Sequence, residues 1–141
     1  MDSAGGAQLQ RCVVIFDGGS RGNPGPAYGS FRLECDSQEP ITARIDFVEE
    51  LTNNQAEYRT LIAALEALLR TLQEQQRAAG DIWLEIRTDS ELVARQLTGA
   101  YRVRDAKLQP LFERVRTMLA RFGGWEVHWQ PRDVIYRYFG H

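Results

Sequence analysis

The chain has 141 residues, of which 43% are hydrophobic and 26% are charged, and its formal net charge is −2 with a pI near 5.7. These values predict one globular domain, and they argue against a protein that binds nucleic acid through bulk positive charge. No apolar run approaches the roughly 20 residues that span a bilayer, and residues 1–10 lack the basic start and apolar middle of a signal peptide. We therefore expect a disordered leader over residues 1–10, a single domain over residues 11–141, a cytoplasmic location and no membrane partner.

Three strands are predicted in the first third of the chain. Residues 11–17 (RCVVIFD) form an apolar run that ends at Gly18 and Gly19, which predicts a buried strand followed by a turn. Alternating apolar and polar residues predict two more strands, over residues 28–35 and 41–49. The short connections between these strands indicate an antiparallel meander.

The clearest predicted helix covers residues 52–76. Thr52 and Gln55 have capping-box spacing, and leucines recur at helical period along one face. Residues 81–88 (DIWLEIRT) predict a strand parallel to the first, because a helical crossover joins the two. A short helix to about residue 98, an amphipathic helix over residues 107–122 and a strand over residues 125–129 complete the chain. The order β-β-β-α-β-α-α-β predicts an α/β fold with a mixed sheet covered by helices.

Two cysteines, Cys12 and Cys35, lie in candidate neighbouring strands. Because no secretion leader precedes them, we expect reduced thiols in the core, and their spacing does not match a metal site. A cross-strand contact is the alternative, and it would allow a disulfide.

Three acidic residues stand out by their positions. Asp17 and Asp89 each follow a predicted strand directly, and the crevice outside the carboxyl ends of parallel strands is where such sheets bind ligands. Glu57 lies four residues before Leu61 and continues the apolar stripe of its helix, so its carboxylate is expected to point at the sheet. One such acid alone would be explained by an ion pair or a helix-dipole contact, but three that converge indicate a site.

A cluster of three carboxylates repels itself at neutral pH and needs a cation. Ligands that are all oxygen, with no His or Cys among them, favour Mg²⁺ or Mn²⁺. Two such ions bridged by a carboxylate activate water and stabilise a leaving oxygen, which is the arrangement used in phosphodiester cleavage.

Four segments resemble the motifs of the ribonuclease H family, type 1, in the same order and at the same spacing. They are FDGGSRGNPGP (16–26), TNNQAEY (52–58), TDSELVARQL (88–97) and YRVRDAKLQPLFERV (101–115), and the similarity extends from Arg11 to about Arg132. The resemblance implies a ribonuclease H-like fold with a five-stranded mixed sheet in the order 3-2-1-4-5. It also implies an endoribonuclease that uses two Mg²⁺ or Mn²⁺ ions to hydrolyse the RNA strand of RNA/DNA hybrids, leaving 5′-phosphate and 3′-hydroxyl ends.

Individual roles also follow from the resemblance. It implies that Asp17, Glu57 and Asp89 are the catalytic metal ligands, with Gly18 as a further candidate ligand. The implied substrate-binding residues are Gly19, Ser20, Asn23, Thr52, Asn53, Asn54, Arg102 and Arg104. For the asparagines among them, the simpler alternative is a solvated helix cap, and for the two arginines it is a solvated loop.

The C-terminus departs from the family pattern. Phe139 stands where the family has a fourth acid, an aspartate, and the helix that follows it in the family is missing. Three explanations are open: a weak enzyme with three acids, a substitute ligand from Asp133 or from the terminal carboxylate of His141, or three acids that suffice with Mn²⁺. We favour reduced but real activity.

The sequence thus predicts a monomeric ribonuclease H that acts on RNA/DNA hybrids without an obligate protein partner. The first alternative is a non-catalytic or weakly active hybrid-binding module. Two others are a metal nuclease of the same superfold that acts on DNA, and a structural α/β domain with a coincidental acid cluster.

Overall fold

A computed structural model describes residues 9–140 of the chain. Most of the expected leader lies outside the described residues, and the first strand already begins at Gln10. Among residues 9–140, no helix is both long and apolar enough to cross a membrane. The elements are β1 (Gln10–Ser20), β2 (Gly25–Cys35), β3 (Ile41–Leu51), α1 (Asn53–Glu74), the 3-10 helix η1 (Ala79–Asp81), β4 (Ile82–Thr88), α2 (Glu91–Leu97), α3 (Gln109–Leu119), β5 (Gly124–Trp129) and α4 (Arg132–Arg137).

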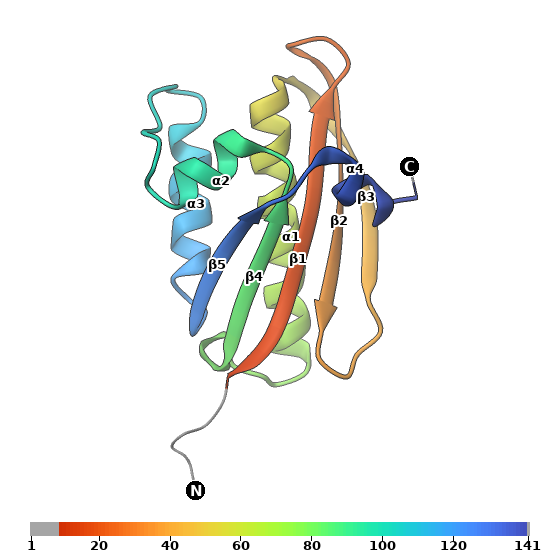
Figure 1. Cartoon of the computed structure of the whole chain (residues 1–141), viewed down its shortest axis with the longest axis vertical. Helices are drawn as coiled ribbons and strands as arrows, with labels where there is room; N and C mark the ends of the chain where they lie inside the picture. Colours follow the sequence, from red (N-terminus) through yellow and green to blue (C-terminus); the bar gives the residue numbers. More distant parts are fainter. Residues whose placement is uncertain (1–8, 141) are drawn as a thin grey trace, which may run out of the picture.

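The five strands form one mixed sheet in the order β3-β2-β1-β4-β5, as predicted. β1 pairs with β2 and β2 with β3 in antiparallel fashion, whereas β4 runs parallel to both β1 and β5. The parallel pairs follow from the helical crossovers between these strands. Figure 1 shows α1 behind the sheet, and α4 on the opposite face near β1 and β2.

The core lies between the sheet and α1, which carries the predicted leucine stripe. Leu61, Leu65 and Leu68 are buried against strand residues such as Phe16 and Ile86. The predicted capping box begins this helix: the Gln55 main-chain nitrogen donates to Thr52 Oγ1 at 3.1 Å, and the Thr52 nitrogen donates to Gln55 Oε1 at 2.8 Å. The burial and the cap together fix where the first turn of α1 meets the sheet.

β1 is longer than the sequence indicated, because Gly18 and Gly19 belong to the strand and do not form a turn. They pair with Gly29 and Tyr28 of β2. A Cβ on Gly18 would lie 2.6 Å from the carbonyl oxygen of Ala56, so the glycine is required by the close approach of β1 to α1. Asp17 therefore lies inside β1 and not just after it.

The cysteines form a disulfide, so the expectation of reduced thiols was wrong. The antiparallel register places Cys12 opposite Cys35, with their Cα atoms 4.1 Å apart. The alternative of a cross-strand contact was therefore correct. It depends on register, which the sequence pattern alone did not determine.

A short helix, α4, follows the last strand, where the sequence suggested no helix. Ile135 is completely buried, and an ion pair of 3.2 Å joins Asp133 to Arg137 one turn later. The side chain of Arg87 donates to the Tyr138 hydroxyl at 2.8 Å and holds the end of the helix to β4. Six residues are too few to show a helical period, so only these tertiary contacts reveal the element.

Candidate active site

The three predicted acids lie together at one end of the sheet. Asp17 comes from β1, Glu57 from the N-terminal part of α1, and Asp89 follows β4 directly. One carboxylate oxygen from each lies within 4.8 Å of the others. The sequence therefore identified a cluster whose members are 40 and 32 residues apart along the chain.

Gly18 orients the most buried of these acids. Its main-chain nitrogen donates to Glu57 Oε1 at 2.6 Å, and Glu57 is the buried residue of the three, whereas Asp17 and Asp89 are half-buried. The absence of a side chain at Gly18 allows this contact, because a Cβ would collide with the backbone of α1. The N–H group is a donor and cannot ligate a cation, so only the carbonyl oxygen of Gly18 remains a candidate ligand.

The electrostatics of the cluster favour a bound cation. Burial, together with the Asp89 charge, raises the pKa of Asp17 to about 6. Burial raises the pKa of Glu57 well above its usual value, with further contributions from Asp17 and Asp89, and burial also raises the pKa of Asp89. These three carboxylates, one buried and two half-buried, offer only oxygen atoms and are more easily ionised beside a positive charge, so they form a donor set that fits a hard divalent cation.

Arg132 is a residue of this site that sequence reasoning missed. Its Nε lies 3.6 Å from Asp89 Oδ2, and its guanidinium stacks over the ring of Tyr136, 5.9 Å from the ring centre. Both Arg132 and Tyr136 belong to α4, which brings them over the cluster. The string Pro-Arg-Asp after the last strand was a visible signal, but its local pattern did not show that the arginine returns to Asp89.

Trp129 also meets the cluster, at the end of β5. Its Nε1 donates to the main-chain oxygen of Asp89 at 3.1 Å, and the side chain is largely exposed. The contact links the end of β5 to the residue that follows β4. It therefore helps to fix the backbone at Asp89.

Asp133, one of the two candidate substitutes for the fourth acid, does not join the cluster. Its side chain is 76% exposed and pairs with Arg137. Phe139, at the family's aspartate position, is half-buried just beyond α4, and its main-chain nitrogen donates to the Tyr136 oxygen at 3.0 Å. The terminal carboxylate of His141 lies outside the described residues.

The predicted substrate-binding turn is tied to the start of α1. Asn53 Oδ1 accepts hydrogen bonds from the nitrogen of Ser20 at 2.9 Å and from its hydroxyl at 3.1 Å. The Asn53 nitrogen donates in turn to Asn23 Oδ1 at 2.9 Å. Asn54 is exposed beside this network, and Thr52 is already used as the helix cap. Ser20, Asn23 and Asn53 thus form one rigid edge next to the acids.

Gly19 lies within this edge for a steric reason. A Cβ there would lie 2.9 Å from the hydroxyl of Tyr28 on the paired strand. The glycine therefore makes room for a tyrosine on the face of the sheet that α4 covers.

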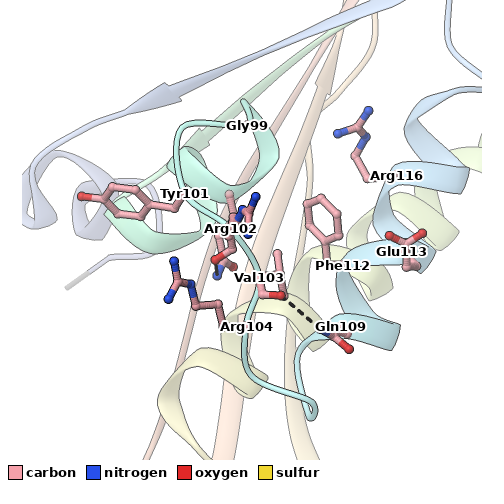
Figure 2. A pocket seen from close by; sticks show the side chains of 10 residues that line it. Gly99, Tyr101, Arg102, Val103, Arg104, Gln109, Phe112, Glu113 and Arg116 are labelled. Carbon is pink, nitrogen blue, oxygen red and sulfur yellow. Dashed lines mark hydrogen bonds between the residues drawn. The ribbon is translucent and has the colours of Figure 1, made fainter.

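Arg102 and Arg104 line a separate groove of about 950 Å³ between the loop after α2 and the helix α3. In Figure 2 both arginines project from the loop, and Phe112 rises from α3 across the groove. The Gln109 amide donates to the Val103 oxygen at 3.2 Å and ties the loop to α3. None of the three clustered acids lines this groove, so the two predicted arginines form a second surface.

A second group of potential ligands, Glu85, Glu126 and His128, lies on the outer face of β4 and β5. Arg11 pairs with both glutamates, at 2.9 Å from Glu126, and Arg87 pairs with Glu85. The two arginines neutralise the group, so it is an ion-pair network and not a second metal centre.

Comparison with known proteins supplies the family. Residues 41–136, more than half of the chain, match the family described as "Reverse transcriptase-like". The chain is 41% identical over 125 residues to ribonuclease HI of Halobacterium salinarum, covering 86% of this chain and 57% of that protein. It is 32% identical over 123 residues to the bifunctional protein Rv2228c of Mycobacterium tuberculosis, of which it covers 32%. The chain therefore spans little more than half of the first relative and a third of the second.

Solved structures agree with the sequence matches. RNase H1 from Halobacterium salinarum superposes with a TM-score of 0.73 at 38% identity, and the match covers 90% of each chain. LC11-RNase H1, solved in complex with an RNA/DNA hybrid, gives a TM-score of 0.74 at 32% identity, covering 89% of each chain. The five-stranded mixed sheet described above is therefore shared with these proteins.

Proposed function

Because this chain belongs to the ribonuclease H family, type 1, we propose that it is an endoribonuclease that hydrolyses the RNA strand of RNA/DNA hybrids. The observation that carries the proposal is the convergence of Asp17, Glu57 and Asp89 within 4.8 Å at one end of the sheet. The hybrid bound by the related LC11-RNase H1 supports the choice of substrate. We further propose that the products carry 5′-phosphate and 3′-hydroxyl ends.

The three acids are proposed to hold two divalent ions, Mg²⁺ or Mn²⁺, in the substrate complex. Bound there, such ions would supply an activated water and charge stabilisation for the leaving oxygen. The protein's own contribution is positional: the Gly18 nitrogen fixes Glu57, and the strand pairing of β1 with β4 sets the separation of Asp17 from Asp89.

Substrate recognition is proposed for two surfaces. The edge formed by Ser20, Asn23 and Asn53 would meet the minor groove, where hydroxyl and amide groups can contact the 2′-hydroxyl that distinguishes RNA from DNA. Arg102 and Arg104, with their groove, would contact phosphates farther along the duplex. Because the net charge of the chain is −2, this binding should be modest and sensitive to salt.

The missing fourth acid supports an activity below that of a four-acid site. A module that binds hybrids without cutting them is the second candidate, and Phe139 at the acid position is the observation that favours it. The monomeric state, the cytoplasmic location and the independence from a protein partner expected from the sequence are kept as part of the proposal.

The decisive experiment is cleavage of an RNA/DNA hybrid labelled on the RNA strand, in Mg²⁺ and separately in Mn²⁺, with Asp17→Asn as the control. The proposal predicts RNA cleavage that the substitution abolishes and an uncut all-DNA duplex. Hybrid binding without cleavage in either ion would establish the binding module instead. Cleavage of the all-DNA duplex would refute the substrate assignment.

A further inference from the structure

The carboxylate cluster carries a counter-ion from its own chain. Arg132 places its Nε 3.6 Å from Asp89 Oδ2, and this is the ion pair that Asp89 makes among residues 9–140. The positive charge opposes the rise in pKa of all three acids, Asp17 and Glu57 included. A single guanidinium therefore acts on the whole cluster and not on one partner alone.

The two partners differ in how freely they can move. The side chain of Asp89 is 8% exposed and held at the end of β4, whereas the side chain of Arg132 is 75% exposed. An exposed arginine side chain can leave a contact by rotating about its own bonds. The pair can therefore open at little structural cost, with Asp89 staying in place.

The helix that carries Arg132 is anchored independently of this contact. Ile135 is completely buried, and Tyr138 accepts a hydrogen bond from Arg87 at 2.8 Å. Figure 1 shows α4 against the face of the sheet near β1. Departure of the guanidinium from Asp89 would thus leave α4 in position.

A divalent cation and the Arg132 guanidinium cannot both bind the Asp89 carboxylate as strongly as either would alone. Like charges a few ångströms apart repel, and each would reduce the attraction of the carboxylate for the other. The chain also has an aromatic residue, Phe139, where the family has another carboxylate, so the negative charge available to a second cation is smaller.

We propose that Arg132 is a built-in counter-ion of the cluster that competes with the divalent ion for Asp89 and thereby lowers metal affinity. The proposal rests on the proposed function, because it takes Asp17, Glu57 and Asp89 to be the metal ligands. Without metal, Arg132 relieves the repulsion among the acids. With metal bound, its side chain turns away, and the ion replaces its charge.

The test measures metal binding without substrate. Thermal melting of the chain is followed in EDTA and in a MnCl₂ titration for wild type, Arg132→Gln and Arg137→Gln. Arg137 is the matched control, because it lies on the same helix, carries the same charge and pairs with exposed Asp133 outside the cluster. We expect Arg132→Gln to melt about 1–4 °C lower than wild type in EDTA. We expect it to reach half-saturation at a Mn²⁺ concentration about 1.4- to fivefold lower, which corresponds to the ~0.2–1 kcal/mol of an ion pair at the protein surface.

Two outcomes would overturn the inference. In the first, Arg132→Gln and Arg137→Gln reach half-saturation at the same Mn²⁺ concentration, which would mean that the change in affinity comes from net charge alone. In the second, Arg132→Gln needs more Mn²⁺ than wild type, so that the arginine supports the metal site. Failure of the proposed function gives a different result. Mn²⁺ would then not raise the melting temperature of the wild type, and the wild type and Asp17→Asn would respond to Mn²⁺ alike.

Discussion

Replacing Gly18 by alanine tests how the site is assembled. The added methyl carbon would lie 2.6 Å from the Ala56 carbonyl oxygen and 2.9 Å from the Glu57 nitrogen, and both are backbone atoms of α1. No side-chain rotation relieves such a contact. The helix or the strand must move by about 0.8 Å, the difference between 2.6 Å and an ordinary contact of 3.4 Å. Overpacking of this kind costs about 1–3 kcal/mol, so we expect the melting temperature to fall by about 3–10 °C.

The same displacement moves Glu57 relative to the other two acids. It also weakens the hydrogen bond of 2.6 Å from the Gly18 nitrogen. A misplacement near 1 Å can cost about 10²-fold in rate, so we expect hybrid cleavage in Mn²⁺ to fall by about that factor. Gly80→Ala is the control, because nothing lies within 4 Å of the position that its added methyl group would take, and it should behave as wild type. If Gly18→Ala melts and cleaves like wild type, close contact between β1 and α1 does not position Glu57.

Three further predictions concern charge, covalent links and the second surface. The pKa of Asp17 in the folded protein, about 6, exceeds its ordinary value of 3.8, so the metal-free protein should lose stability as pH rises from about 3.8 to about 6. Melting curves in EDTA between about pH 4 and pH 8 test this, and the gain from Mg²⁺ should be larger near pH 7 than near pH 5, because protons compete with the ion. Reduction of the Cys12–Cys35 disulfide, which joins residues 23 apart, should lower the free energy of unfolding by about 3 kcal/mol. Melting curves with and without dithiothreitol measure this, and equal melting temperatures would contradict the prediction. The double variant Arg102→Gln, Arg104→Gln should raise KM for the hybrid with little change in kcat. The slope of log affinity against log salt concentration should also decrease, by the amount that up to about two phosphate contacts contribute. An unchanged salt dependence would show that the groove does not bind the hybrid.

Several features of the site were predictable because they depend on neighbours in the sequence. The capping box at Thr52 and the leucine stripe of α1 repeat at fixed spacings, and the structure confirms both. The position of Glu57 on that stripe was sufficient to predict that it points at the sheet. The strand runs before Asp17 and Asp89, joined by a helical crossover, were sufficient to predict that these two acids meet.

Other features were decided only when distant segments packed together. Two glycines in a row resemble a turn, but Gly18 is required because β1 passes against the backbone of α1. The disulfide depends on a strand register that sets Cys12 opposite Cys35. A shift of one residue in the pairing of β1 with β2 would have turned one thiol to the other face of the sheet. The local sequence around either cysteine does not indicate which residue lies opposite it.

The sequence by itself determined the order of the main elements up to β5 and the three acids, because periodicity and capping act over short stretches of chain. The strand order of the sheet followed from the resemblance of its motifs to the family. Tertiary structure decided what neutralises those acids and whether Asp133 replaces the missing fourth one. Arg132 reaches Asp89 because Ile135 anchors a helix too short to leave a periodic signal, whereas Asp133, one residue later, faces solvent. Adjacent residues on one helical turn point in different directions, so only the docking of α4 determines which of the two meets the cluster.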